Sequence, residues 1–213
     1  TTMNVMPYPV PTWGWEICET PWTVQSLWWH YTYSMDVEFL RTRAYTPIRA
    51  AVQFLVDYMQ RPEAQWDGVY HIFPTVSPEL YGLTPGLRKN ADCIVDLTLT
   101  KFVFKAFLEA VTVLDIQSQE HELVTAVRDI LAHFPSYPTA DTPAGPVFVS
   151  VPHEDPEVVY NVPSSTTTIF PGEEHGLHSP PAEYAIAART LRQQRNEGGN
   201  ELVFLNLQYA RMG

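Results

Sequence analysis

The stretch YHIFPTVSPELYG, residues 70–82, places Glu79 directly after a proline and among aromatic residues. A carboxylic acid donates a proton efficiently near neutral pH only if its pKa is raised, and a partly apolar setting raises it. The flanking Tyr70, Phe73 and Tyr81 would offer such a setting. The residue types therefore make Glu79 a candidate general acid. A loop glutamate that makes only turn contacts is the alternative.

Two other groups of polar residues have both a functional and a structural interpretation. His30 has the chemistry to hydrogen-bond a ligand hydroxyl, but a helical histidine beside Tyr31 is as often a core residue. The stretch GEEHGLH, residues 172–178, gathers two glutamates and two histidines. Its spacing matches no standard zinc pattern, so we expect a loop that caps the following helix, and no metal site. The sequence also carries no phosphate-binding loop, nucleophile elbow or CxxC pattern.

Composition excludes several classes of partner. The 213 residues carry a net charge of −11, and no Lys/Arg cluster interleaves with aromatic residues, so nucleic acid is not an expected partner. No apolar run approaches the ~20 residues needed to span a bilayer, so membrane association is not expected. Cys18 and Cys93 are too few for a disulfide framework. Two buried free thiols are favoured over a pair, and the compartment stays open on this evidence.

The spacing of apolar residues predicts a mostly helical chain. Expected helices begin near Pro21, Asp36, Thr46, Asn90 or Asp92, Ser118, Pro180 and Asn200. The helix that ends near Leu114 is apolar on nearly all sides, which is typical of a buried inner helix. Strand-like segments are GVYHIF at 68–73 and GPVFVSV at 145–151, and the latter is expected to pair with EVVYNV at 157–162.

Several stretches, taken in order, resemble one enzyme family. Residues 22–59, WTVQSLWWHYTYSMDVEFLRTRAYTPIRAAVQFLVDYM, resemble a helix pair in the catalytic domain of glycoside hydrolase family 95. PTVSPE at 74–79 resembles that family's Ser-Pro-Glu loop. The ends of DPEVVYNVPSSTTTIFPG, residues 155–172, resemble its Asp-Pro and Pro-Gly landmarks, and LQYARMG at 207–213 looks like the start of its late inner helix. The resemblance covers nearly the whole chain.

The resemblance implies a fold and an activity. Family members, which include α-L-fucosidases and α-L-galactosidases, fold as an (α/α)6 barrel. We therefore expect an all-α, partial (α/α)6 barrel with short β-hairpin insertions, in which residues 1–213 form a single domain from the middle of a larger catalytic domain. The implied function is cleavage of an α-linked sugar by inversion, with Glu79 as proton donor and no required cofactor. The resemblance also implies an extracellular or periplasmic location.

The candidate sugar-binding residues combine aromatic rings, which can stack on sugar faces, with hydrogen-bonding groups. They are Trp22, Trp29, His30, Tyr81, Tyr160 and Asn161. Ordinary core packing remains the alternative for the aromatic residues.

The sequence departs from the family pattern at three places. Leu80 follows the glutamate where the family usually has asparagine. Tyr160, Asn161 and Val162 replace a histidine-rich cluster, and Trp29 replaces an acid in the helix pair. Because these positions help to recognise the sugar, the identity of the sugar stays open.

The resemblance also implies that part of the machinery is missing. An inverting glycosidase needs a second carboxylate roughly 6.5–9.5 Å from the acid. In the family, that aspartate lies beyond the stretch matching LQYARMG. A non-catalytic carbohydrate-binding or scaffold domain is therefore the competing hypothesis. A partial barrel would also leave residues 93–114 and 201–213 under-covered, so we expect the remainder of a parent chain, or a second copy, as a partner.

Overall fold

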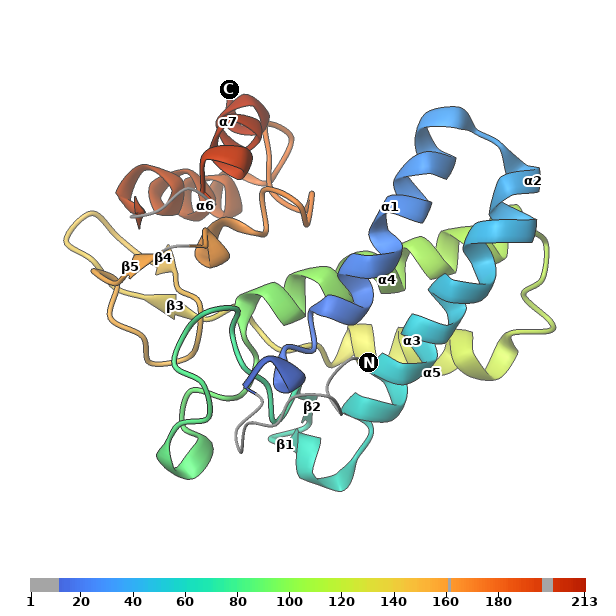
Figure 1. The fold of residues 1–213 in the computed structure, drawn as a ribbon, viewed down its shortest axis with the longest axis horizontal. Helices are drawn as coiled ribbons and strands as arrows, with labels where there is room; N and C mark the ends of the chain where they lie inside the picture. Colours follow the sequence, from blue (N-terminus) through green and yellow to red (C-terminus); the bar gives the residue numbers. More distant parts are fainter. Residues whose placement is uncertain (1–11, 161, 197–200) are drawn as a thin grey trace. The chain divides into compact units, whose positions relative to one another are not determined.

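A computed structural model describes residues 12–160, 162–196 and 201–213, and its longest helix is α4, Ile94–Val113 (Figure 1). Every residue from 92 to 100 is buried, so the prediction of a buried helix here is confirmed. The chain divides into two compact units, and α4 contributes to both. We call them the helical unit, Cys18–Ile72 with Leu99–Pro135, and the loop-rich unit, Thr1–Ile17 with Phe73–Thr98 and Ser136–Gly213.

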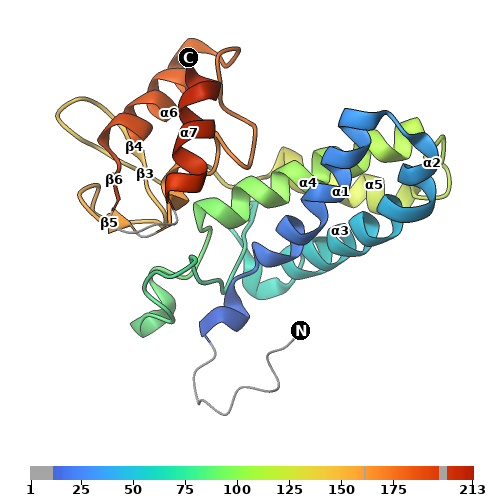
Figure 2. The same cartoon turned by 45° about the horizontal axis from the view of Figure 1, so that its top comes forward.

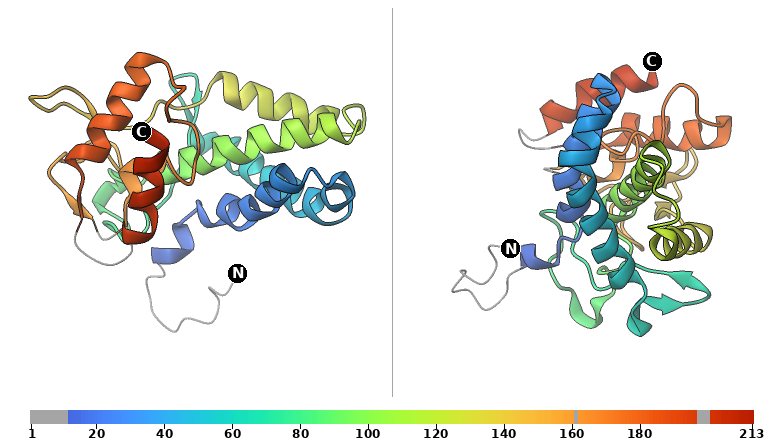
Figure 3. Two further views of the ribbon diagram at one scale, coloured as in Figure 1. Left: turned by 90° about the horizontal axis from the view of Figure 1, so that it is seen from above. Right: turned by 90° about the vertical axis from the view of Figure 1, so that its right-hand side faces the viewer.

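The helical unit consists of helices packed about the part of α4 from Leu99 onward. Its other helices are α1 (Glu19–Ser34), α2 (Val37–Phe39), the π-helical turn Leu40–Ala44, α3 (Tyr45–Met59) and α5 (His121–Ala132). Helix α3 contacts α1 and α5, and α5 runs alongside α4 (Figure 3). Ring contacts join α4 to its neighbours: Trp29 of α1 meets Phe102 edge-on, and Tyr45 of α3 stacks on Phe107. The expectation of a mostly helical chain is confirmed.

Sequence periodicity explains how α3 packs. Ile48, Val52, Leu55 and Met59 recur at the spacing of one helix face, and all four are fully buried. The shorter helix before it begins where expected, because the Asp36 carboxylate accepts a hydrogen bond from the Phe39 amide (2.9 Å) and so caps α2.

A small hairpin follows α3. Strand β1, Gln65–Trp66, pairs antiparallel with β2, Val69–Tyr70. Asp67 and Gly68 connect them with positive φ angles of 54° and 74°, as a tight hairpin turn with the right twist requires. The strand predicted over 68–73 is thus reduced to two residues. The Tyr70 amide donates to the His133 carbonyl (3.1 Å), which ties the hairpin to the end of α5.

The loop-rich unit combines two late helices with short strands. Helix α6, Pro181–Gln193, lies beside α7, Glu201–Met212 (Figure 2). Strand β3, Thr139–Ala140, pairs antiparallel with β4, Val147–Phe148, and α6 contacts β4. Strand β5, Val159–Tyr160, pairs in parallel with β6, Arg195–Asn196.

The predicted pairing of segment 145–151 with segment 157–162 is wrong. Residues 147–148 instead pair with a strand that precedes them. The turn between these strands is closed locally, because the backbones of Thr142 and Gly145 exchange two hydrogen bonds and the Thr142 hydroxyl also donates to the Gly145 carbonyl (2.7 Å). Short loops close at lower entropic cost than long ones. The strand nearest in the sequence, β3, therefore pairs with β4.

Of the two helices expected to be under-covered, α4 is buried and α7 is exposed. The apolar residues of α4 from Val103 to Val111 are buried, apart from the half-buried Leu108, so that helix is not under-covered within this chain. Helix α7 does expose apolar side chains, with Leu202 66% and Val203 67% exposed, and Leu207 and Tyr209 also reach solvent. Both cysteines are buried and neither forms a disulfide, as expected. Across the described ranges, we find no helix with the length and apolarity to traverse a bilayer.

An ion pair links two segments of the helical unit. The Arg49 guanidinium donates from Nε to both carboxylate oxygens of Glu120, at 2.7 and 2.9 Å. Burial alone would raise the pKa of Glu120, but hydrogen bonding and charge attraction from this arginine outweigh it, and the pKa is lowered. Burial and the same carboxylate raise the pKa of the nearby Tyr45 hydroxyl.

This pair predicts an acid-sensitive contribution to stability. A carboxylate whose pKa falls on folding stabilises the fold above its unfolded pKa, about 4.3, and loses that contribution as the pH falls through the folded value. Glu120→Gln should cost about 1 kcal/mol at pH 7, and that cost should shrink towards pH 3. Urea midpoints measured across this range test it, with the exposed Glu122→Gln as control. An equal cost at both ends of the range would contradict the assignment.

Candidate functional site

Glu79 lies on the loop that connects the hairpin region to α4. Its side chain is exposed, and its backbone adopts a positive φ of 57°; Tyr81, two residues later, does the same at 64°. Such angles are uncommon for residues with a side chain and indicate that the surrounding loop holds them. The apolar enclosure expected around Glu79 is not found, since within this chain the side chain faces solvent.

Asn90 holds the loop closed from the inside. Its buried side-chain oxygen accepts from the Thr84 amide (2.8 Å) and the Thr84 hydroxyl (2.7 Å). Its side-chain nitrogen donates to the carbonyls of Thr75 (2.9 Å) and Gly82 (2.8 Å). A single amide therefore joins three points of the loop that carries Glu79.

A second anchor is the buried carboxylate of Glu154, which is only 4% exposed. It accepts from the Tyr81 hydroxyl and from the Ser150 amide, both at 2.7 Å. Burial, followed by this hydrogen bond, raises the pKa of Tyr81. The Lys89 ammonium lies 3.8 Å from the centre of the Tyr81 ring, a cation–π contact on its face. Tyr81 is therefore held at both its hydroxyl and its ring.

The base of the loop is fixed to the start of α4. The Thr75 hydroxyl donates to the buried carboxylate of Asp96, in the first turn of that helix, at 2.6 Å. The Thr75 amide donates to the Asn90 carbonyl (2.8 Å), and the next amide, of Val76, donates to the Trp15 carbonyl (2.8 Å). Glu79 is thus presented at the exposed end of a loop whose base is ordered.

Three of the predicted sugar-binding residues belong to the helical unit, on α1. Trp22 and Trp29 are half-buried, and the ring of Trp29 meets Phe102. His30 is exposed and its ring centre lies 4.0 Å from that of Phe39, so it is not a core residue. No compact unit contains both these residues and Glu79.

The remaining predictions fall on the loop-rich unit. Tyr81 shares a loop with Glu79 and is partly exposed. Tyr160 lies in β5, where it pairs with Asn196. Asn161 is outside the described residues. Their roles therefore stay predictions.

The segment after β5 packs against α7. Residues 164–169 are all buried, and the Thr166 hydroxyl donates to the side-chain oxygen of Gln208 (3.0 Å). Gln208 is fully buried and donates from its nitrogen to the Phe170 carbonyl (3.0 Å). The tertiary structure thus brings together two stretches, SSTTTIFPG and LQYARMG, that are far apart in the sequence.

The cluster in GEEHGLH is divided among separate contacts. Glu173 pairs with Arg211, Glu174 accepts from the Tyr137 hydroxyl, and the buried His175 stacks on the Phe148 ring (5.3 Å between centres). His178 is exposed. Among described residues, no set of three or more His, Cys, Asp or Glu side chains is grouped to hold a metal ion. Capping of α6 was expected here, but its N-cap is Pro180, without a side-chain cap hydrogen bond.

Sequence reasoning missed Asn90 and Glu154. Asn90 was considered only as a helix start, and α4 begins four residues later, at Ile94. Glu154 lies in the stretch PHEDP, where three charged or titratable residues lie among prolines without a periodic pattern. Only the burial of these side chains distinguishes them, and no local signal in the sequence reports it.

Comparison with known proteins gives two findings. The family described as "Glycosyl hydrolase family 95 catalytic domain" matches residues 2–213. A relative in Arabidopsis thaliana, "Alpha-L-fucosidase 2", is 28% identical over 180 residues. That match covers 83% of this chain and 21% of the relative, so the chain spans about a fifth of that protein's length.

The Asn90 clamp predicts a large local effect of a small substitution. Asn90→Ala removes four hydrogen bonds in a buried position, which should destabilise the loop by about 2–4 kcal/mol. Hydrogen exchange at amides 75–90 should accelerate while exchange in α3 stays unchanged. Asn206→Ala, an exposed asparagine in the same unit, is the matched control. Unchanged protection of the Thr84 amide in Asn90→Ala would contradict the clamp.

Proposed function

The chain belongs to glycosyl hydrolase family 95, and from that premise we propose that it is part of a glycoside hydrolase catalytic domain in which Glu79 protonates the leaving oxygen. The observation that carries the proposal is the presentation of Glu79. It is an exposed carboxyl on a loop ordered by Asn90 and by the Tyr81–Glu154 hydrogen bond. A general acid must be held in place by its supporting residues while remaining open to substrate.

The chemistry asked of Glu79 is proton donation to the glycosidic oxygen as the bond to the sugar carbon breaks. In an inverting reaction, a second carboxylate takes a proton from the attacking water on the opposite face of the sugar. We propose that the parent protein supplies this base from outside the chain, within a complete (α/α)6 barrel. Enclosure of Glu79 by that parent protein would then provide the apolar setting that favours the protonated acid.

The substrate class proposed is an α-linked sugar, with fucose or galactose as first candidates. The Arabidopsis thaliana relative is named as an α-L-fucosidase, which supports this choice. Tyr81 is the best-supported contact, because it lies two residues from Glu79, is partly exposed and has a fixed ring. We propose that the protein encounters its substrate outside the cytoplasm.

A non-catalytic carbohydrate-binding domain is the second candidate. Leu80, Trp29 and Tyr160 depart from the family pattern at positions that help to recognise the sugar, and these departures favour it. Under this proposal the complete protein binds a glycan without cleaving it.

Replacing the acid in the complete parent protein tests the enzyme proposal. Glu79→Gln keeps the shape and removes the proton, so kcat/KM on a natural α-glycoside should fall by about 10²- to 10⁴-fold. The same variant should lose far less activity on a glycosyl fluoride, whose leaving group needs little protonation. Glu157→Gln, an exposed glutamate of the same unit, serves as control.

Two results would decide against the acid role. Equal losses on both substrates would indicate disturbed binding, not lost proton donation. A parent protein that binds glycans with no cleavage by wild type or variant would favour the non-catalytic candidate.

We propose that the exposed apolar surface of α7 packs against a partner, which is the rest of the parent protein or a second copy. Leu202 and Val203 expose two-thirds of their area, and adjacent Leu207 and Tyr209 extend this surface. The 213-residue chain alone should therefore self-associate, and the double change Leu202→Lys with Val203→Lys should reduce association. Sedimentation velocity measures it, with the exposed Gln193→Lys on α6 as control. A compact wild-type monomer with a cooperative melt would contradict the proposal.

A further inference from the structure

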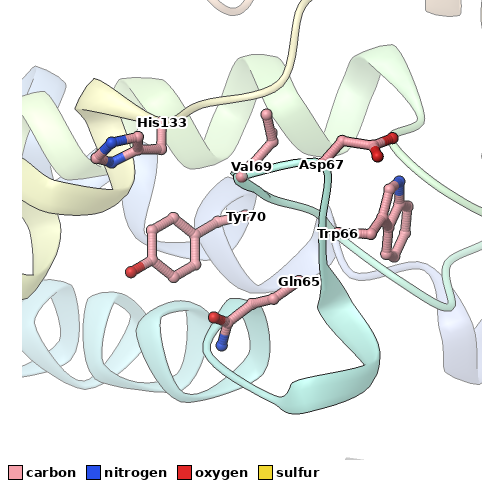
Figure 4. A pocket seen from close by; sticks show the side chains of 7 residues that line it. Gln65, Trp66, Asp67, Val69, Tyr70 and His133 are labelled. Carbon is pink, nitrogen blue, oxygen red and sulfur yellow. The ribbon is translucent and has the colours of Figure 1, made fainter.

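The hairpin β1–β2 borders a hollow that the proposed mechanism does not use. The hollow holds about 490 Å³, within the range of small-molecule sites, and lies between the hairpin and the end of α5 (Figure 4). Its lining comes from residues 65–70 and His133, all in the helical unit. None of these lining residues belongs to the loop that carries Glu79.

The two sides of the hairpin offer different groups. In the antiparallel register, Gln65 pairs with Tyr70 and Trp66 with Val69, so the two pairs point to opposite faces. Figure 4 shows Gln65 and Tyr70 on the side of His133, and Trp66 on the other side of the hairpin. One side is thus rich in hydrogen-bonding groups, whereas the other carries a large aromatic ring.

Trp66 is held as a platform. Its indole is 37% exposed, yet it stacks on the imidazole of the buried His71, with 3.6 Å between ring centres and 5° between ring planes. The ring is thereby fixed by His71 while more than a third of the residue's surface reaches solvent. An aromatic ring fixed in this way loses little conformational entropy when a ligand stacks on it.

The polar side is also ordered. The Tyr70 hydroxyl donates to the Asp129 carboxylate of α5 at 2.5 Å, and the Tyr70 amide donates to the His133 carbonyl. The Gln65 side-chain nitrogen donates to the Gln60 carbonyl, which orders this amide at the wall of the first hollow. A second hollow, of about 520 Å³, is lined by residues that include Asp129, Gln60 and Thr125.

These features select for a particular kind of ligand. Among the described residues, the groups that line the hollows include amides, three carboxylates, hydroxyls and imidazoles, but no lysine or arginine. An anionic ligand would find no cation there. A ligand with many hydroxyls and one apolar ring face matches both the polar groups and the indole.

We propose that this hairpin is a surface binding site for a neutral oligosaccharide, with one sugar ring stacked on Trp66 and a neighbouring unit hydrogen-bonded beside Tyr70 by Gln65 and His133. The choice of ligand class rests on the proposed function, but the site does not depend on Glu79. Its role would be to hold a glycan on the surface of the protein.

Binding to the 213-residue chain tests the site. Neutral trisaccharides (maltotriose, cellotriose and fucosyllactose) would be titrated while NMR follows the indole N–H signals. At least one trisaccharide should shift the Trp66 signal saturably and bind more tightly than glucose. Trp66→Ala should weaken binding about tenfold or more, Trp66→Tyr should retain part of it, and Gln65→Ala should weaken it severalfold. Tyr33→Ala, which removes another exposed aromatic of the helical unit, should change nothing.

Each outcome decides the proposal. Absence of binding across the panel, or unchanged affinity in Trp66→Ala, would overturn it. If Trp66→Ala unfolds, Gln65→Ala and Trp66→Tyr carry the test, because both leave the turn intact; unchanged affinity in both would overturn it equally. Glu79→Gln should leave this binding intact, so failure of the catalytic proposal and failure of this one are distinguishable.

Discussion

Burial of α4 is the constraint on which the rest of the structure depends. Every residue from 92 to 100 is buried, and beyond this stretch aromatic residues of the helix pack against rings from α1 and α3. A helix that is apolar on nearly all sides must be covered on nearly all sides, because each exposed apolar side chain forfeits about 1.5–3 kcal/mol of transfer free energy. The neighbouring elements of each unit therefore serve first to cover this helix.

The start of α4 also contains buried polar groups, which require hydrogen-bond partners. Asp96 and Thr98 are buried in the helix, and a buried carboxylate needs a hydrogen-bond partner. Thr75 supplies one, at the base of the loop that carries Glu79. The loop is consequently ordered by the same requirement that orders the helix, with Asn90 closing it from inside. The position of a candidate acid on this loop therefore depends on the packing of the core.

Membership of the family and the local structure bear on function in different ways. The family match covers residues 2–213 and indicates glycoside hydrolysis as the class of chemistry. The structure contributes the supports of the Glu79 loop and the junction of SSTTTIFPG with LQYARMG through Gln208.

What the sequence determined by itself is local. The apolar stripe of α3, the Asp36 cap, the all-round apolar α4 and the position of Glu79 after its proline follow from spacing and residue type, since each depends on neighbours within a few positions. Only the tertiary structure decided which strands pair, that Glu79 is exposed, and that Asn90 and Glu154 hold its loop. It also decided that Trp66 stacks on His71 to form a platform. These depend on contacts between segments whose separation in the sequence carries no periodic signal. Closure of a nearby turn, or burial of a single amide, selects among pairings that local propensity leaves equivalent.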